Sequence, residues 1–199
     1  MKIYVARHGQ NEDNAAGILN GHRNKRLTPL GRQQAIVLGH TIKELGIFPD
    51  KVEVSPLGRA IETAIIAGFT RHFVEPGLIE RNFGSMTGKL ISEIKTLCAP
   101  DIIETELITY FLNVPGAETF PVLLERAKRE IQRMKDDPYG TRLLFTHGDF
   151  GKMLYCAYYD LDWMSCLVNF HFGNSELLLL SPDTHPDNAH VFKQEQHNH

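Results

Sequence analysis

Short runs of apolar residues alternate along the chain with longer segments whose apolar residues recur at helical spacing. The short runs predict β-strands, and the longer segments predict amphipathic helices. The predicted strands are residues 2–6, 52–54, 142–146, 167–172 and 175–181. The predicted helices are residues 29–45, 56–67, 118–135 and 149–159. This alternation is typical of α/β proteins, so we expect a three-layer sandwich with a mostly parallel central sheet and helices on both faces.

Two of the predicted helices begin at a hydroxyl-bearing residue that is followed by proline. Thr28 precedes Pro29, and Ser55 precedes Pro56. A Thr or Ser side chain can accept a hydrogen bond from the first helical turn, and proline suits the first helical position. We therefore expect Thr28 and Ser55 to begin their helices in the same way, and Gly46 to end the first of them.

The middle of the chain has weaker patterns. We expect residues 73–79 to be extended and residues 82–88, which are rich in glycine and polar residues, to form a loop. The segment 89–113 is mixed, and Pro100 lies inside it. Because proline interrupts helices, this segment predicts two short helices separated at Pro100.

No internal repeat or linker divides the chain. A length of 199 residues suits one domain. The sequence predicts a single domain over residues 1–181, in which residues 89–117 form a small cap insert. Residues 182–199 are rich in histidine and are expected to form a loosely ordered tail.

The charge and the apolar content limit the classes of partner. The formal net charge is −3, so no global basic field attracts nucleic acid. No run approaches the ~20 apolar residues of a membrane span. Lys2 and the strand-like start argue against a signal peptide. We expect neither a nucleic acid nor a membrane as partner, and the sequence does not specify an oligomeric state.

The cysteine pattern indicates the redox compartment. The chain has three cysteines, Cys98, Cys156 and Cys166. An odd number without paired spacing argues against a disulfide framework and fits a reducing environment. We therefore expect three buried thiols and a cytoplasmic location.

The chemistry-bearing residues lie where predicted strands end. The first strand runs into Arg7-His8-Gly9, and the strand at 142–146 runs into His147-Gly148. In sheets of this class, ligands bind outside the carboxyl ends of the strands. Two imidazoles can therefore meet over one ligand, and a phosphate is the ligand that suits such a site best.

A phosphoryl-transfer site needs a nucleophile, cations and an acid. His8 can attack phosphorus as a neutral imidazole. Arg7 and Arg59 offer planar forks that match phosphate oxygens, and His147 adds a donor if it is protonated. Glu80 follows an extended segment and is the best candidate for the acid, for which its pKa should be raised.

These residues stand in longer patterns that resemble a known family. The matching segments are Arg7-His8-Gly9, Asn14 in the following loop, Leu27–Ala35, Ser55–Ala64, Glu80–Gly88 and Thr146-His147-Gly148, in this order. Together they resemble the histidine phosphatase superfamily, also called phosphoglycerate mutase-like. The resemblance covers residues 3 to 180.

The resemblance implies a mechanism. His8 would become a phosphohistidine while Glu80 protonates the leaving group, and water would then hydrolyse this intermediate with Glu80 as base. The phosphoryl and substrate contacts would come from the following residues: Arg7, Asn14, Asn20, Gly21, Arg59, His147 and Gly148. No metal or other cofactor is implied, and the partners would be a small phosphomonoester and inorganic phosphate.

Hydrolysis is favoured over mutase activity. Family mutases retain a bisphosphorylated intermediate with basic residues of a longer insert, including an adjacent Arg pair. Here residues 89–117 contain only Lys89 and Lys95 as cations. A phosphoglycerate mutase is the first alternative, and a non-catalytic member that binds phosphorylated ligands or proteins is the second. The physiological substrate is not specified.

Several positions depart from the family pattern. Gln10-Asn11 replaces the usual Glu-Ser or Glu-Thr, and His22 stands where mutases often have Trp. Asp149 replaces a small residue after His147-Gly148. Its carboxylate either lies near the mouth of the pocket or caps the following helix, and we favour the cap.

Other phosphatase chemistries fit less well. None of the three cysteines is followed by arginine at the spacing of a Cys-dependent phosphatase, Cys-x5-Arg. Asp160-Leu161-Asp162 lacks the preceding strand of an aspartyl nucleophile. The histidines of the tail could bind a metal only adventitiously, because a loosely ordered segment is a poor cage.

Overall fold

The computed structural model describes residues 1–196 and contains a three-layer α/β fold. Its central sheet has six strands in the order β3-β2-β6-β1-β7-β8. The strands are β1 (Lys2–Arg7), β2 (Lys51–Val54), β3 (Phe73–Val74), β6 (Thr141–Thr146), β7 (Leu177–Leu180) and β8 (His190–Phe192). Strands β3, β2, β6 and β1 are parallel, and β7 runs antiparallel to β1. The predicted fold class is confirmed.

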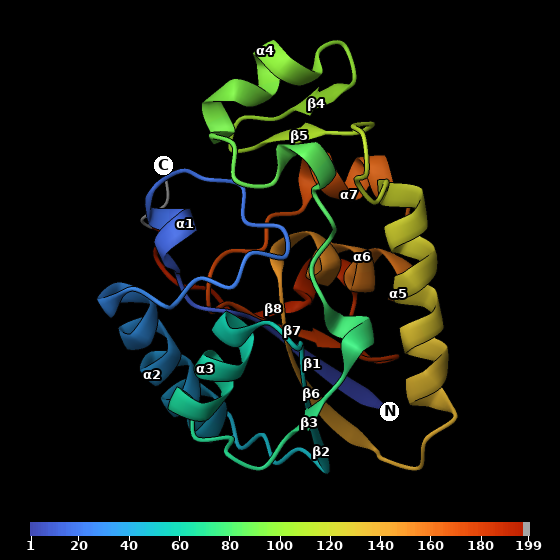
Figure 1. The fold of residues 1–199 in the computed structure, drawn as a ribbon. Coiled ribbons are helices and arrows are strands. Elements are labelled where there is room, and N and C mark those ends of the chain that lie inside the picture. Colours follow the sequence, from blue (N-terminus) through green and yellow to red (C-terminus); the bar gives the residue numbers. More distant parts are fainter. Residues whose placement is uncertain (197–199) are drawn as a thin grey trace.

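Helices cover both faces of this sheet (Figure 1). The α-helices are α1 (Glu12–Ala15), α2 (Pro29–Glu44), α3 (Gly58–Ile66), α4 (Ile94–Cys98), α5 (Phe120–Lys135), α6 (Gly148–Tyr158) and α7 (Trp163–Asn169). Short 3-10 helices are η1 (Pro76–Leu78), η2 (Gly84–Met86), η3 (Ile91–Glu93) and η4 (Pro186–Asn188). Among residues 1–196, no helix is both long and apolar enough to cross a membrane.

The strands distribute their side chains between two cores. Ile3 and Val5 of β1 pack into the cluster that contains the apolar faces of α5 and α6. Ala6, the next residue along β1, packs into the cluster formed with α2 and α3. On β6, Leu144 packs into the first of these clusters and Phe145 packs into the second. This alternation is the expected consequence of a strand whose two faces are both buried.

A small separate layer of structure lies above the sheet domain in Figure 1. It consists of η3, α4 and the antiparallel hairpin of β4 (Ile102–Glu104) and β5 (Thr109–Phe111). We call residues 91–111 the cap. A third apolar cluster, which includes Phe83, Met86, Ile94 and Phe111, joins the cap to the loop beneath it.

The cap corrects the prediction of two short helices over residues 89–113. Only one of them forms, as α4, and the residues after Pro100 form the β4–β5 hairpin. β-Branched and aromatic residues favour strands, and the hairpin turn is closed by Thr105, whose hydroxyl donates to the Ile108 carbonyl and accepts from the Ile108 amide. The expected extended segment 73–79 is likewise limited to β3, after which η1 begins.

The last part of the chain holds two further corrections. The predicted strand at 167–172 is wrong, because the helix α7 covers Trp163–Asn169 with Asp162 accepting a hydrogen bond from the Ser165 amide as its N-cap. The expected loosely ordered tail is also wrong for the described residues, since β8 pairs with β7 and completes the sheet. Residues 197–199 of that tail lie outside the described residues.

Of the two predicted helix starts, one is confirmed and the other is wrong. Thr28 accepts a hydrogen bond from the Gly31 amide as the N-cap of α2. Helix α3, however, begins only at Gly58, after Leu57, and lacks a side-chain cap. Ser55 does not begin that helix, and its hydroxyl serves another residue described below.

Two glycines allow the loop after β1 to pack closely against the start of α2. A Cβ on Gly9 would collide with the Gly31 carbonyl, and a Cβ on Gly31 would collide with the Gln10 carbonyl. The glycine that follows His8 is therefore needed for this backbone packing. The contact fixes the segment that carries His8 against α2.

We predict that Gly31→Ala lowers the free energy of unfolding by about 1–3 kcal/mol, because backbone must move to admit the methyl group. The matched control is Gly140→Ala, where the nearest atom to an added Cβ is the Asp50 carboxylate at 3.4 Å. Urea denaturation followed by circular dichroism measures both. Equal stability of the two variants would contradict the packing argument.

Candidate active site

The two strand-end histidines meet at one edge of the sheet. Strands β1 and β6 are neighbours with Arg7 opposite Thr146, so His8 and His147 follow at equivalent positions. The His8 amide donates to the Thr146 carbonyl at 3.0 Å. The ring centroids of His8 and His147 are 5.2 Å apart, and both side chains are buried. Parallel pairing therefore brings together two residues that lie far apart in the sequence.

The hydrogen bonds of His8 determine its tautomer. Its Nδ1 lies 2.7 Å from the Gly9 carbonyl, which can only accept, so Nδ1 carries the proton. Arg59 Nε donates to His8 Nε2 at 3.0 Å, which requires a lone pair on Nε2. Burial, followed by the nearby charges of Arg59 and Arg7, lowers the pKa of His8 well below its ordinary value. His8 is thus a neutral imidazole with its lone pair beside a guanidinium.

Arg59 lies in the first turn of α3 and is held by backbone carbonyl groups. Its two terminal nitrogens donate to the Arg23 carbonyl at 2.8 Å and the Gly21 carbonyl at 3.0 Å. Burial lowers the pKa of Arg59 to about 10, so the guanidinium remains charged at neutral pH. Because its hydrogen bonds go to neutral acceptors, two carbonyls and the His8 ring, its positive charge is available to an anion.

Arg7 provides a second guanidinium. One terminal nitrogen donates to the Phe172 carbonyl at 2.6 Å, whereas Nε is buried and has no partner among residues 1–196. A Cβ on Gly148 would lie 3.3 Å from the centre of this guanidinium, which shows how closely the start of α6 approaches it. Burial lowers the pKa of Arg7, but arginine stays charged in proteins.

His147 is held by Ser55. Its Nε2 lies 2.6 Å from the Ser55 hydroxyl, and its Nδ1 is buried without a hydrogen-bond partner in the described part of the chain. Burial and then the charge of Arg59 lower the pKa of His147 well below its ordinary value. The ring is therefore neutral in this structure, whereas a bound dianion would favour its protonated form.

Glu80 is a buried carboxyl at the same edge. Its Oε1 accepts hydrogen bonds from the Arg81 amide at 2.9 Å and from the Phe150 amide in the first turn of α6 at 3.1 Å. Burial, followed by the negative charge of Asp149, raises the pKa of Glu80 above its ordinary value. A raised pKa is what a general acid needs near neutral pH.

Asp149 does not cap α6, which corrects the favoured prediction. His147 is the N-cap residue, and Asp149 lies inside the first turn. Its carboxylate instead forms an ion pair of 2.8 Å with Nε of Arg81, a side chain that is almost completely buried. The Arg81 guanidinium also lies over the rings of Phe83, Phe111 and Phe120. Asp149 thus belongs to the environment of Glu80.

The loop after β1 borders the site. Asn20 and Asn11 exchange side-chain hydrogen bonds, and Asn14 accepts from the Asn11 amide. The carbonyl of Gly21 supports Arg59, as described above, so Gly21 lies beside the site through its backbone. Asn174 donates to the His8 carbonyl at 3.0 Å and to the Asn14 side chain at 3.5 Å. These contacts fix the loop against β1.

Sequence reasoning missed three of these residues. The Ser55 hydroxyl is hydrogen-bonded to His147, and Arg81 forms an ion pair with Asp149. Asn174 donates a hydrogen bond to the His8 carbonyl. Ser55 lies directly after β2, at the same sheet edge as the two histidines, and this position was its only sequence signal. In the part of the chain that the structure describes, no group of three metal-ligating side chains is placed to hold a metal ion.

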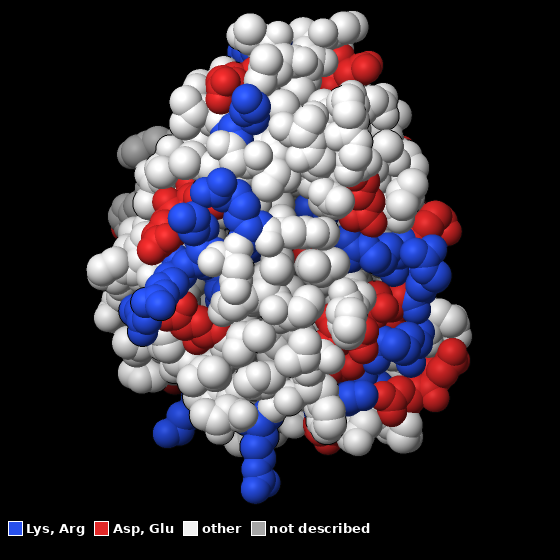
Figure 2. All heavy atoms as spheres, in the orientation of Figure 1, with Lys and Arg blue, Asp and Glu red and all other residues white. Residues whose placement is uncertain are grey.

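The positive charge of the site is local. Figure 2 shows Lys and Arg interspersed with Asp and Glu on one face, with a group of basic side chains over the loop between α1 and α2. Within the site, two guanidinium groups and two neutral imidazoles lie near a carboxyl of raised pKa. Such an arrangement can bind a dianion, attack it with an imidazole and donate a proton.

Comparisons with known proteins agree with this geometry. A broad-specificity phosphatase of Saccharomyces cerevisiae is 36% identical over 99 residues, which are 47% of this chain and 43% of the yeast protein. That match therefore spans less than half of the yeast protein. A 2,3-bisphosphoglycerate-dependent phosphoglycerate mutase of Bartonella henselae is 28% identical over 174 residues, 80% of this chain and 82% of the mutase.

Solved structures share the fold. A mycobacterial glucosyl-3-phosphoglycerate phosphatase superposes with a TM-score of 0.77 at 21% identity, covering 90% of this chain and 92% of that chain. A phosphoserine phosphatase of Entamoeba histolytica superposes with a TM-score of 0.72 at 24% identity, covering 89% of each chain. At these identities the superpositions show the fold alone.

The family model described as histidine phosphatase superfamily (branch 1) matches residues 3–192. This match confirms the resemblance that the Arg7-His8-Gly9 and His147-Gly148 motifs indicated. The chain belongs to the histidine phosphatase superfamily.

Proposed function

We propose that this protein is a metal-independent phosphomonoesterase that forms a phosphohistidine intermediate at His8. The observation that carries the proposal is the hydrogen bonding of the His8 ring. The Gly9 carbonyl holds the proton on Nδ1, and burial keeps the imidazole neutral, so Nε2 has a lone pair, which accepts from Arg59 in this structure and becomes free for attack when Arg59 turns to the phosphoryl group. A neutral, oriented imidazole is the form that a nucleophilic histidine needs.

In the first step, Nε2 of His8 forms a bond to phosphorus as the bond from phosphorus to the leaving oxygen breaks. Glu80 transfers its proton to that oxygen, and the alcohol leaves. Arg7 and Arg59 bind the non-bridging oxygens, with His147 Nδ1 as a further donor, and Asn14, Asn20, Gly21 and Gly148 border the substrate. The cations offset the charge that builds up on the transferring group.

In the second step, water attacks the phosphohistidine. The ionised Glu80 accepts a proton from this water, the bond between phosphorus and Nε2 breaks, and inorganic phosphate leaves. Apart from substrate and water, both steps use only groups of the chain, so activity in EDTA is expected. The substrate is a small phosphomonoester, as the names of the phosphatase relatives suggest.

Phosphatase activity is proposed in preference to mutase activity, although a curated relative is a mutase. A mutase must hold a second phosphate and exclude water. Residues 89–117 offer only Lys89 and Lys95, and Lys95 pairs with Glu104 at 2.8 Å. A non-catalytic binding role is the other alternative.

The three cysteines are free and buried, which supports a cytoplasmic location.

We predict that His8→Ala lowers phosphate release by at least about 1,000-fold and abolishes the acid-labile phosphoenzyme. A panel of phosphomonoesters assayed in EDTA measures the first, and acid quenching with labelled substrate measures the second. The matched control is His40→Ala, which removes an exposed histidine and should retain full activity.

The same panel separates the alternatives. It includes 3-phosphoglycerate with catalytic 2,3-bisphosphoglycerate. Isomerisation without net phosphate release would identify a mutase and contradict the proposal. A folded protein with neither activity would support the binding role.

A second prediction concerns the acid. Glu80→Gln should slow alkyl phosphates by about 100-fold or more, because their alkoxide leaving groups need a proton. The loss for 4-nitrophenyl phosphate should be smaller by at least tenfold, since its leaving group is stable as an anion. Glu125→Gln, at an exposed position, is the control. Equal losses on both kinds of substrate would remove Glu80 from this role.

A third prediction concerns pH. The charge of Asp149 raises the pKa of Glu80, so Asp149→Asn should lower that pKa. The acid form would then be lost at lower pH, and the alkaline limb of kcat/KM for an alkyl phosphate should move to lower pH. Asp183→Asn, at an exposed site, controls for the loss of one charge. A shift to higher pH would show that the limb reports another group.

A further inference from the structure

A buried lysine lies beside the candidate active site without an ionic partner. Lys152 is on α6, one helical turn after Gly148, and is only 2% exposed. Its ammonium group donates to the hydroxyl of Tyr110 on β5. Among residues 1–196, no carboxylate forms an ion pair with it. A buried ammonium is costly unless another group compensates it, so this position calls for an explanation.

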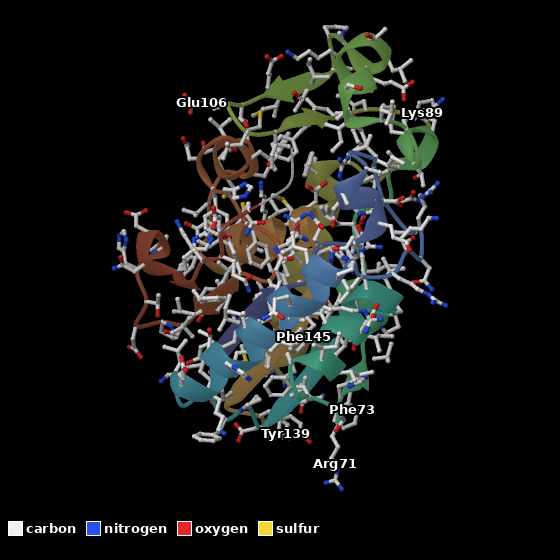
Figure 3. The ribbon with its side chains drawn as sticks, turned by 90° about the vertical axis from the view of Figure 1, so that its left-hand side faces the viewer. Arg71, Phe73, Lys89, Glu106, Tyr139 and Phe145 are labelled. Atoms are coloured by element: carbon white, nitrogen blue, oxygen red, sulfur yellow. The ribbon has the colours of Figure 1, made fainter. Side chains whose placement is uncertain are left out.

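Lys152 and Tyr110 line a hollow between the cap and the sheet domain, with a volume of about 420 Å³. The turn of the β4–β5 hairpin forms one wall, and the end of α7 with the following residues to His171 forms another. Figure 3 labels Glu106 at this end of the hairpin, above the helix. The volume lies in the range of pockets that hold small organic molecules.

The hollow has an apolar rim. Leu107 of the hairpin turn is 74% exposed, and Val168 of α7 is 54% exposed. Both residues line the hollow, together with Ile108 and Leu167. Its composition therefore suits an organic group, with Lys152 as the buried cation.

The hollow lies near the residues proposed for catalysis, although none of them lines it. Lys152 is close enough to Asp149, Arg7 and Glu80 for their charges to act on its pKa, which burial lowers to about 8. His171, on the wall of the hollow, directly precedes Phe172, whose carbonyl holds Arg7. Lys152 also lies on the helix whose first turn donates to Glu80. Lys152 lies one turn along α6 from Gly148, which approaches the Arg7 guanidinium, so the buried cation is near the proposed phosphate site.

We propose that this hollow receives the organic part of the substrate and that Lys152 binds a second anionic group on it. The inference rests on the proposed phosphatase function and specifies its substrate class, a phosphomonoester with a further anionic group. Glu106, Tyr110 and His171 are the other titratable groups that line the hollow. Burial raises the pKa of Tyr110 and lowers the pKa of His171 to about 4, so both are neutral at pH 7, whereas Lys152, with a pKa of about 8, is mostly protonated.

The test compares three substrates of the same skeleton: phenyl phosphate, 3-carboxyphenyl phosphate and 4-carboxyphenyl phosphate. For Lys152→Met, the fall in kcat/KM on at least one carboxylated substrate should exceed the fall on phenyl phosphate by about tenfold or more. Each variant is compared with the unaltered protein on the same substrate, so differences between the leaving groups cancel.

Three further variants make the test specific. Lys152→Arg keeps the charge and should recover most of the preference for the carboxylated substrate. Leu107→Glu places a negative charge on the exposed rim, where folding is not at risk, and should weaken the same preference. Lys128→Met removes a lysine that is exposed on α5 and should change nothing. Equal losses on all three substrates in Lys152→Met would show a structural role and overturn the inference.

A binding measurement separates this inference from the proposed function. Calorimetry with phenyl phosphate and with 3- and 4-carboxyphenyl phosphate compares His8→Ala with His8→Ala/Lys152→Met, and neither protein needs to be catalytically active. An affinity about tenfold lower in the double variant for a carboxylated phosphate, with that for phenyl phosphate unchanged, supports the subsite, even if the unaltered protein releases no phosphate and the proposed function fails. Equal affinities of the two proteins for both carboxylated phosphates would overturn the subsite while leaving the phosphatase proposal intact.

Discussion

The pairing of β1 with β6 is the constraint on which the site depends. The two strands are parallel and in register, so the residue after each strand lies at the same edge, and these residues are His8 and His147. A shift of one residue along either strand would exchange the buried faces of that strand and separate the rings. The apolar residues of β1, which belong to two different cores, make such a shift unfavourable. The packing of the fold thus determines the geometry of the chemistry.

The two arginine side chains of the site are held by backbone carbonyl groups. Arg7 donates to the Phe172 carbonyl, and Arg59 donates to the carbonyls of Gly21 and Arg23. Carboxylate partners would have neutralised these charges, whereas carbonyl oxygens orient them and leave the charge for a ligand. Burial lowers the pKa values of His8 and His147, and the same uncompensated charge lowers them further. The positive charge that would attract an anion thus also favours neutral imidazoles.

The sequence predicted the features that depend on strand ends and on local patterns, namely a helix cap and the group of site residues at one sheet edge. Thr28 caps α2, and His8, Arg59 and His147 come together because parallel strands end at one edge. What it could not predict depends on distant contacts. Asp149 looks like a cap by position, yet it pairs with Arg81, which lies far away in sequence. Likewise, Ile102–Glu104 and Thr109–Phe111 form strands because the two halves of the hairpin pair with each other.

Helix α6 connects the separate parts of the proposed mechanism. Its first turn donates to Glu80 and carries Asp149, which raises the pKa of that carboxyl, and the next turn presents Lys152 to the hollow under the cap. The cap contributes walls and a hydroxyl at Tyr110, but the buried cation belongs to the sheet domain. Recognition of a second anionic group on Lys152 would then be tied to the same rigid helix that positions the acid. The cap is coupled to both charges, because Tyr110 accepts a hydrogen bond from Lys152, and the Phe111 carbonyl accepts one from Arg81, the partner of Asp149.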